Sequence, residues 1–459
     1  MIWFLLQKVG FFIFVILTAY FVLKKKYESL LTLYFFGLTF NTFFYFYVTT
    51  WNPSKIVKLG MVVCLFLESY KRKSTAINLV YSTVILFIVT ILLSDIIGLA
   101  FPGKYAPQLS RGIRMFNASF TYLTATAMLL FGLILKPGFV KRIFPSYCLA
   151  VEIAIASGVI HYVCLKSGIG FMPIMRQFGD PNIEAVANMG GSLVNRIYGF
   201  AGEPKNLGFL VCPYVLILVM MLGRGVYRIN KTYHLIALGV GLFVLINTYS
   251  SSALLNFFFA LPIVLLLLPF PKITYKAGTV ILLACVAASF WLLSKNTYIY
   301  PYKSGESSFV TQIYERTFVR AEDELENDRQ ETVVFNHFIN EGNVIFKIFG
   351  WGVAQYTFHV PNQVLGNNRL IPMQSGIVMT IVDFGLLGLL LLGFVSYVII
   401  KLLILSIRSS SIYALAFSVA TLSSFIGSLM YGNIVTCFIY LMLAIYSYYD
   451  EQESSIIKS

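Results

Sequence analysis

Charge is scarce in this chain of 459 residues. Only 12% of the residues are Asp, Glu, Lys or Arg, whereas 58% are hydrophobic and 16% are aromatic. An ordinary soluble domain is excluded, because runs of roughly 17–25 apolar residues recur, which is the length that a helix needs to cross a bilayer. The short alternating segments of a membrane β-barrel are absent. The sequence therefore predicts an all-α polytopic membrane protein.

Motifs for nucleotide chemistry and for common covalent catalysis are also missing. The sequence has no Walker loop, no dinucleotide fingerprint and no nucleophile elbow with a Ser-His-Asp set. The 6 cysteines lie in or beside apolar runs, a pattern that indicates neither a disulfide nor a zinc site. We therefore expect no cofactor and no metal. The energy for any reaction must come from the substrate or from a gradient.

Positive charge is in excess, with a formal net charge of +14. Most Lys and Arg residues form short clusters between apolar runs, and such basic loops mark the cytoplasmic side of a membrane protein. The clusters are Lys24–Lys26, Lys71–Lys73, Lys136 with Lys141 and Arg142, Arg224 with Arg228 and Lys231, and Lys401 with Arg408. They indicate topology rather than binding to nucleic acid.

The apolar runs, oriented by these loops, predict about 12–13 membrane helices, with the N-terminus outside and the C-terminal tail inside. The expected helices are 5–23, 30–50, 54–70, 77–101, 115–135, 143–165, 207–223, 232–250, 252–269, 274–294, 375–400, 411–430 and 433–449. Two connections, 166–206 and 295–374, are much longer than the others and fall on the extracytoplasmic side. Connections of this length are usually functional or disordered, and the aromatic and aliphatic residues at helical spacing in these two indicate order. We therefore expect residues 1–459 to form one membrane domain with two large outer loops.

The first outer loop ends in a polar run, 195–206, just before an apolar stretch. Arg196, Glu203 and Lys205 crowd together there, which is costly beside lipid. Arginine presents a planar fork of donors that suits phosphate, and a glutamate in a partly dry site can act as a general base. Tyr198 lies in the same run. The run also suits a plainer role, as an interfacial anchor and a turn that leads into a helix.

The second outer loop carries further candidates. Arg320 and Arg329 are potential phosphate ligands. Two of the chain's 4 histidines, His337 and His359, lie in this loop and are alternatives to Glu203 as general base, although a lone histidine is more often structural. The acidic run that precedes Arg329 lacks the ligand spacing of a metal-binding loop and indicates a solvated helix face.

A helix is predicted within this loop, from about 327 to 340. Four apolar side chains are expected to pack it against the rest of the protein: Val334, Phe335, Phe338 and Ile339.

Two glycine motifs follow this helix. Gly350-Trp351-Gly352 lets the loop turn back, and Gly385-Leu386-Leu387-Gly388 lets the returning helix pack closely. Asp383 is an acid inside an apolar run, and it is either a functional group or a buried hydrogen-bond partner.

The order of these motifs resembles the O-antigen polymerase (Wzy) and O-antigen ligase superfamily. The matching residues are Arg196, Gly199, Glu203-Pro204, Arg329 ahead of Gly350-Trp351-Gly352, and Gly385-Leu386-Leu387-Gly388. Two departures matter. The run Thr248–Ser252 lacks an arginine that the family often has, and Gln374-Ser375 stands where ligases commonly have His-Asn. The second departure favours a polymerase over a ligase.

The resemblance implies a fold similar to the C-type glycosyltransferases and a metal-independent reaction in lipopolysaccharide biosynthesis. Undecaprenyl-pyrophosphate-linked oligosaccharide repeat units would be joined at the outer, periplasmic face of the bacterial inner membrane. A chain-length regulator and a flippase are the implied protein partners. By the same resemblance, pyrophosphate would bind Arg196, Arg329, Lys205 and Arg320, the base would be Glu203, His337 or His359, and other parts of the substrate would contact Tyr198 and Gln374.

Two alternatives remain open from the sequence. An O-antigen ligase would use the same chemistry but transfer the polymer to lipid A core. A flippase or secondary transporter belongs to a different class, in which paired repeats, broken helices and midplane charges are common. The absence of an evident repeat and the gathering of charge in the outer loops favour an enzyme.

Overall fold

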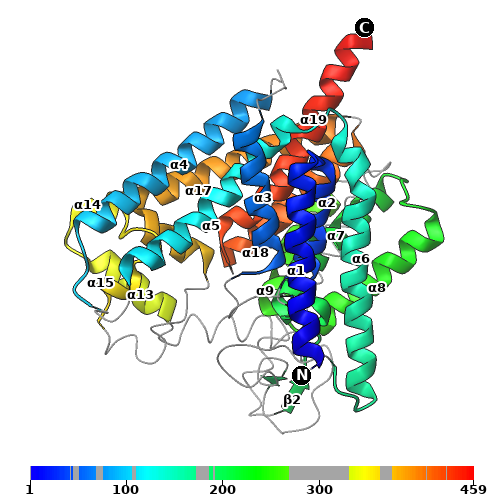
Figure 1. The fold of residues 1–459 in the computed structure, drawn as a ribbon, viewed down its shortest axis with the longest axis horizontal. Helices are drawn as coiled ribbons and strands as arrows, with labels where there is room; N and C mark the ends of the chain where they lie inside the picture. The colour runs from blue at the N-terminus through cyan, green and yellow to red at the C-terminus, as the bar shows by residue number, and fades with distance from the viewer. Residues whose placement is uncertain are drawn as a thin grey trace. The chain divides into compact units, whose positions relative to one another are not determined.

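The computed structural model describes residues 2–41, 43–44, 51–68, 76–105, 110–171, 186–189, 192–267, 330–361, 375–409, 411–430 and 432–458. Apart from one short hairpin, the regular structure in these ranges is helical (Figure 1). Within them, 7 helices are long and apolar enough to cross a membrane. They contain the segments Leu5–Leu23, Asn78–Ala100, Arg111–Ile134, Phe139–Lys166, Pro204–Gly223, Gly376–Arg408 and Ile412–Met430. The chain is therefore an α-helical, multi-pass membrane protein.

Two compact units make up the chain. The first comprises Met1–Cys64 and Gly138–Asp323, and the second comprises Leu65–Pro137 and Glu324–Ser459. Each unit thus combines segments that are distant in sequence, and each is described by itself.

The first unit is built around α7. Its elements are α1 (Ile2–Leu23), α2 (Tyr27–Thr39), most of α3 (Pro53–Leu67), α6 (Phe139–Lys166), β1 (Val186–Met189), β2 (Ser192–Asn195), η2 (Gly199–Ala201), α7 (Pro204–Gly223), α8 (Lys231–Asn247) and α9 (Ser251–Leu267). Helix α7 packs against α6, α8 and α9. It is apolar on all sides, as a helix surrounded by other helices must be. The hairpin pairs β1 with β2 antiparallel inside the long connection between α6 and α7.

The second unit is built around α17 and α18. Its elements are α4 (Ala76–Ala100), α5 (Arg111–Phe131), η1 (Gly132–Ile134), α13 (Gln330–Asn340), α14 (Val344–Phe349), α15 (Tyr356–His359), α17 (Gly376–Arg408), α18 (Ile412–Met430), η5 (Ile434–Cys437) and α19 (Phe438–Lys458). Helix α18 packs against α17 and α19, and α4 packs against α5 and α17. The short helices α13 and α14 both pack on α17.

Helix α17 is broken near its start. Gly385 has φ +61° and ψ −139°, which is outside the helical region. A Cβ atom at this position would lie 2.6 Å from the carbonyl oxygen of Lys347 in α14. Only glycine tolerates both the backbone angle and this close approach, so the kink allows α14 to pack directly on α17.

Several predicted helices agree with the structure, including those expected at 77–101, 207–223 and 411–430. The expected helix 30–50 is wrong in extent, because α2 ends at Thr39. Beyond that point Asn41 pairs through its side chain with Ser54, whose hydroxyl donates to it at 2.6 Å. The expected helix 274–294 lies outside the described residues. Within the described part, fewer helices than expected are long enough to cross a membrane. Helices α2, α3, α8 and α9 are too short, with only 13, 15, 17 and 17 residues.

The helix predicted over 327–340 is confirmed as α13, although the expected packing of Ile339 is wrong. Val334 and Phe338 are buried at 0% and 2% exposure, whereas Ile339 is 48% exposed. Residues four apart share one face of a helix, and the next position is rotated by about 100°. Because the face of Val334 and Phe338 turns inward, Ile339 turns outward.

Candidate functional site

The polar turn ahead of α7 belongs to the first unit, and its proline and glycine residues determine its backbone conformation. Pro204 is the first residue of α7, where its missing N–H costs no helical hydrogen bond. Gly199 and Gly202 have φ angles of +49° and +77°, which favour glycine. A Cβ atom at Gly199 would lie 3.0 Å from the backbone nitrogen of Gly158 in α6. The turn is therefore seated closely against α6.

Two side chains of α6 hold this turn. The Nδ1 atom of His161 accepts a hydrogen bond from the backbone N–H of Tyr198 at 3.0 Å. The hydroxyl of Ser157 accepts one from the N–H of Phe200 at 2.9 Å. Because Nδ1 is an acceptor, the imidazole is neutral and carries its proton on Nε2. Neither residue was predicted from the sequence. Their spacing of four positions, which places them on one helix face, is the signal that would have found them.

Arg196 is anchored at the end of α8. Its Nε–H donates to the carbonyl of Thr248 at 3.1 Å, and the next N–H, that of Ile197, donates to the carbonyl of Asn247 at 3.3 Å. The carbonyl end of a helix carries partial negative charge and attracts a guanidinium. The arginine predicted to bind phosphate is thus half-buried and oriented through its Nε atom.

The other two charged residues of the turn pair with each other. The Nζ atom of Lys205 lies 3.2 Å from Oε2 of Glu203, and the two side chains are 33% and 15% exposed. The candidate base therefore has a cation beside it. Tyr198 is buried, and burial raises the pKa of its hydroxyl to about 12. It remains a neutral hydrogen-bonding group near pH 7.

In the second unit, two acidic side chains accept hydrogen bonds from the backbone of the glycine turn 350–354. Asp95 in α4 accepts a hydrogen bond from the N–H of Val353 at 3.2 Å, and Asp383 in α17 accepts one from the N–H of Ala354 at 3.1 Å. Of the two roles considered for Asp383, the structure shows the buried hydrogen-bond partner, since this residue is 1% exposed. Asp95 was missed, although it too is an acid inside an apolar run.

The glycines of this turn have the role that the sequence predicts. The N–H of Gly352 donates to the backbone carbonyl of Asp383 at 3.2 Å. Gly350 has a φ of +79°, and a Cβ atom there would collide with that same carbonyl. A Cβ atom at Gly98 in α4 would lie 2.6 Å from the carbonyl oxygen of Trp351. The loop can therefore turn back and pack closely only with glycine at these positions.

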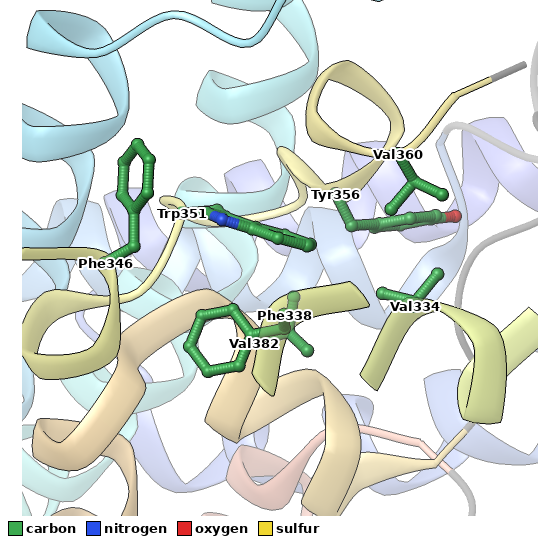
Figure 2. Packing of buried hydrophobic residues seen from close by; sticks show 7 residues of the cluster. All are labelled: Val334, Phe338, Phe346, Trp351, Tyr356, Val360 and Val382. Carbon is green, nitrogen blue, oxygen red and sulfur yellow. The ribbon is translucent and has the colours of Figure 1, made fainter. Parts of the chain in front are cut away.

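Trp351 is central to the apolar core beneath the turn. The core contains Val334, Phe338, Phe346, Trp351, Tyr356, Val360 and Val382 (Figure 2). The indole of Trp351 is fully buried and meets the ring of Phe338 edge-on, with 5.1 Å between centroids. Residues from α13, α14, α15 and α17 thus share one core, which holds the short helices of the second long connection against α17.

The two candidate histidines of the second loop both lie beside Trp351. The ring of His359 stacks on the indole with 4.9 Å between centroids and 4° between planes, and the ring of His337 lies 6.1 Å away. Burial, followed by the charges of Arg111 and His337, lowers the pKa of His359 to about 4. His359 is therefore neutral at pH 7 and is a weak base there.

Three candidates lie outside the described residues: Arg320, Arg329 and Gln374. Their predicted roles stay predictions. The same holds for the expected pairing of Arg329 with Arg196 around one pyrophosphate group.

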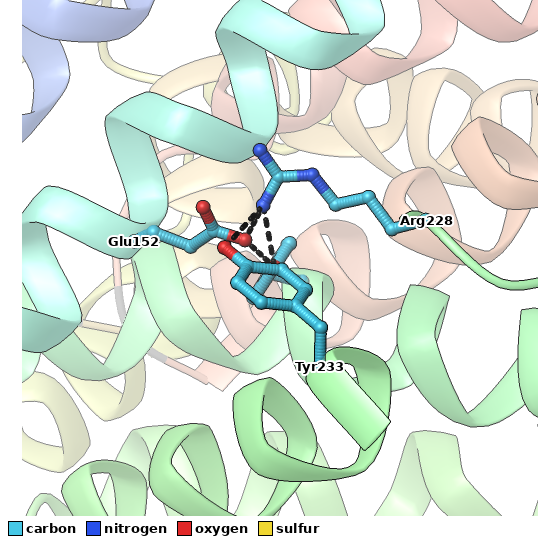
Figure 3. A network of polar contacts seen from close by, with 4 residues as sticks. Glu152, Arg228 and Tyr233 are labelled. Atoms are coloured by element: carbon cyan, nitrogen blue, oxygen red, sulfur yellow. Dashed lines mark hydrogen bonds and ion pairs between the residues drawn. The ribbon is translucent and has the colours of Figure 1, made fainter. Parts of the chain in front are cut away.

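A further charged cluster lies within the first unit. Arg228, counted above as a marker of topology, forms an ion pair through Nη1 with Glu152 of α6 (Figure 3). The hydroxyl of Tyr214 donates to Glu152 at 2.5 Å, and Nη1 of Arg228 donates to the hydroxyl of Tyr233 at 3.3 Å. The two charged side chains are only 12% and 17% exposed. This cluster joins α6, α7 and α8.

No protein-family model and no curated protein matches this chain.

Proposed function

We propose that this protein is a glycosyltransferase that polymerises O-antigen, or a related surface polysaccharide, from undecaprenyl-pyrophosphate-linked oligosaccharide repeat units. The proposed site faces the periplasm or cell exterior, on the side that the basic loops predict for the polar turn. One observation carries the proposal: hydrogen bonds to α6 and to the end of α8 hold the turn 196–205, which bears three charged side chains.

The way the turn is held argues against a simple interfacial anchor. An anchor needs only charged side chains near the headgroups. Here His161 and Ser157 of α6 bind the backbone of the turn, and the end of α8 orients Arg196. A guanidinium that is already fixed loses less conformational entropy on binding than a flexible one does. This favours recognition of a charged substrate.

The proposed glycosyl transfer requires only a base and cationic groups. A hydroxyl oxygen of one repeat unit attacks the anomeric carbon of the growing chain's first sugar. The bond from that carbon to the pyrophosphate oxygen breaks, and undecaprenyl pyrophosphate leaves with the bonding electron pair. A base accepts the hydroxyl proton. Cationic groups stabilise the charge that develops on pyrophosphate, and this electrostatic contribution is commonly the largest in such reactions.

The residues of the turn take roles in this scheme. Arg196 and Lys205 bind pyrophosphate. The roles of Arg320 and Arg329 in binding it stay predictions, because both lie outside the described residues. Of the three candidate bases, Glu203, His337 and His359, we favour Glu203, because it lies in the same turn as Arg196 and its side chain is 15% exposed. Tyr198 contributes a neutral hydroxyl for the substrate.

The decisive test compares arginine variants in cells that carry a deletion of the gene. Arg196→Ala should abolish long polymer, with single repeat units remaining on lipid A, while the protein stays folded and inserted. Arg196→Lys should retain part of the activity, because it keeps the charge but loses the fork. Lys141→Ala removes an exposed cation from the same unit on the predicted cytoplasmic side and serves as the control. Normal polysaccharide ladders from Arg196→Ala would refute the proposal.

One observation favours the transporter alternative. Helix α17 is interrupted at Gly385 within an apolar segment, and discontinuous helices are a feature of secondary transporters. Reconstituted liposomes distinguish the two functions. Movement of a lipid-linked oligosaccharide across the bilayer without chain growth would support a flippase, whereas chain growth on one face without movement would support the polymerase.

A further inference from the structure

Two arginines project from the first turn of α5 onto α15. Nη2 of Arg111 donates to the carbonyl of Gly103 at 3.2 Å, and its guanidinium lies 4.8 Å from the centre of the Phe358 ring. Nη2 of Arg114 donates to the hydroxyl of Tyr356 at 3.2 Å, and the guanidinium carbon of Arg114 lies 5.3 Å from the centre of the same tyrosine ring. Each arginine is thus held by a hydrogen bond and an aromatic face. Neither forms an ion pair with an acid in the part of the chain that the structure describes.

The loop after α4 packs closely against α15, which the two arginines contact. The N–H of Tyr105 donates to the carbonyl of Phe358 at 3.1 Å. A Cβ atom at Gly103 would collide with the same carbonyl, so the loop after α4 lies directly on α15. The hydrogen bonds and ring contacts therefore hold both guanidinium groups beside α15.

Several polar atoms of α15 and of Arg111 are buried and lack a hydrogen-bond partner among the described residues. They are Nε of Arg111, Oγ1 of Thr357 and Nε2 of His359. The threonine is 0% exposed and the histidine 8%. Buried polar groups are nearly always paired in folded proteins. Three unpaired groups on α15 and on the arginine stacked against it therefore indicate a ligand with oxygen atoms.

The start of α5 makes an anion the favoured ligand. The first N–H groups of this 21-residue helix have no partner within the helix, and Ser110 at its N-cap makes no side-chain capping bond. A helix N-terminus beside two guanidinium groups attracts negative charge. The neighbouring positions Ile113 and Phe116 are 64% and 68% exposed, which provides apolar surface for a hydrocarbon chain.

We propose that Arg111 and Arg114 form a binding site for the phosphate group of a membrane lipid at the predicted outer end of α5. The guanidinium groups and the free N–H groups of α5 bind the phosphate oxygens, and the lipid chain lies along Ile113 and Phe116. The site does not depend on the polymerase reaction. If that reaction is correct, this is a second phosphate-binding element in addition to the turn that carries Arg196.

Binding is measured on the full-length protein, purified in detergent and stripped of lipid, by native mass spectrometry. The probes are undecaprenyl phosphate, phosphatidylglycerol and inorganic phosphate. The double variant Arg111→Gln/Arg114→Gln should bind lipid phosphate at least about tenfold more weakly, because two charge-assisted contacts are lost. Lys104→Gln, which removes an exposed cation from the adjoining loop, should bind as the wild type does.

The probes identify the source of the phosphate. Undecaprenyl phosphate that resists competition by phosphatidylglycerol indicates an isoprenoid lipid, and equal competition indicates a bulk phospholipid. Displacement by inorganic phosphate indicates a site for the free ion as well.

Unchanged affinity for all three probes in the folded double variant overturns the proposal. If that variant does not fold, the single variants Arg111→Gln and Arg114→Gln replace it, and unchanged affinity in both of them has the same meaning. A variant that loses binding but still makes normal polysaccharide ladders would leave this site established and separate it from the polymerase function.

Discussion

The Nδ1 atom of His161 accepts the backbone N–H of Tyr198 at 3.0 Å, and this bond joins α6 to the turn that contains Arg196. It requires a neutral ring with its proton on Nε2. The ring also stacks on Phe171, with 4.2 Å between centroids. His161 is therefore a positioning residue, since it acts on the proposed substrate-binding groups through the backbone of the turn.

The first prediction concerns this bond. His161→Leu removes the acceptor and leaves a buried N–H unpaired, which should lower the free energy of unfolding by about 1–3 kcal/mol and should shorten or abolish the polymer. His161→Asn offers an acceptor close to the position of Nδ1 and should restore part of the polymer length. Polysaccharide gels and thermal unfolding in detergent measure the two effects.

His234→Leu is the matched control for this prediction. His234 is buried in the same unit, but its Nε2 atom pairs with the carbonyl of Leu218 at 2.9 Å, away from the polar turn. It should lose stability and keep polymer length. Equal polymer loss in the two leucine variants would show that His161 acts through stability alone.

The second prediction compares two glycines of α17. Gly385→Ala places a side chain at φ +61° and 2.6 Å from the Lys347 carbonyl, and should destabilise the protein by roughly 1–3 kcal/mol. Gly393→Ala has open space around it in the same helix, and should stabilise by roughly 0.5–1 kcal/mol. Thermal unfolding of both variants in one detergent measures the difference. Equal melting temperatures would contradict the proposed strain at the kink.

This kink shows how far sequence reasoning reaches. The apolar run at 375–400 predicts a helix, and the structure confirms one at Gly376–Arg408. The break at Gly385 depends on contact with Lys347 and Gly350, which are separated from it in sequence. Local propensity carries no information about such contacts. The sequence pattern therefore predicts the helix but not its interruption.

The candidate sites show the same limit. Arg196, Glu203 and Lys205 were found because charged residues stand out beside an apolar stretch. His161 was not found, because a single histidine within an apolar helix is more often structural. Its importance lies in the hydrogen bond to Tyr198, 37 positions away. Arg111 was likewise not found, because its aromatic partner, Phe358, is distant in the sequence.

The third prediction concerns pH. The pKa of His359 is lowered to about 4 from an ordinary value of 6.5, chiefly by burial and further by the charges of Arg111 and His337. Below pH 6.5 the unfolded chain binds this proton more readily than the native protein does. Stability should therefore fall as the pH drops from 6.5 to 4, by about 3 kcal/mol over the full range.

His359→Phe keeps an aromatic ring to stack on Trp351 and removes the titration. Thermal unfolding between pH 7 and pH 5 should show a shallower decline for this variant than for the wild type. Parallel curves for the two proteins would contradict a lowered pKa at His359.

The fourth prediction concerns the ion pair of Glu152 and Arg228, whose side chains are only 17% and 12% exposed. Removing one partner leaves an uncompensated charge in a poorly solvated place, so Arg228→Gln should destabilise the protein by roughly 3–5 kcal/mol. Glu152→Gln/Arg228→Gln removes both charges, leaves neutral groups for Tyr214 and Tyr233, and should recover much of that loss.

The exposed pair of Arg142 and Glu28 supplies the comparison, because its side chains are 47% and 32% exposed in the same unit. Arg142→Gln should change stability by at most about 1 kcal/mol, since solvent screens the pair. A double-mutant cycle on each pair, followed by thermal unfolding, gives the two coupling energies. If the cycle on Glu152 and Arg228 gives no more coupling than the exposed pair, water reaches the cluster. Its role in joining α6 to the loop before α8 would then rest on packing alone.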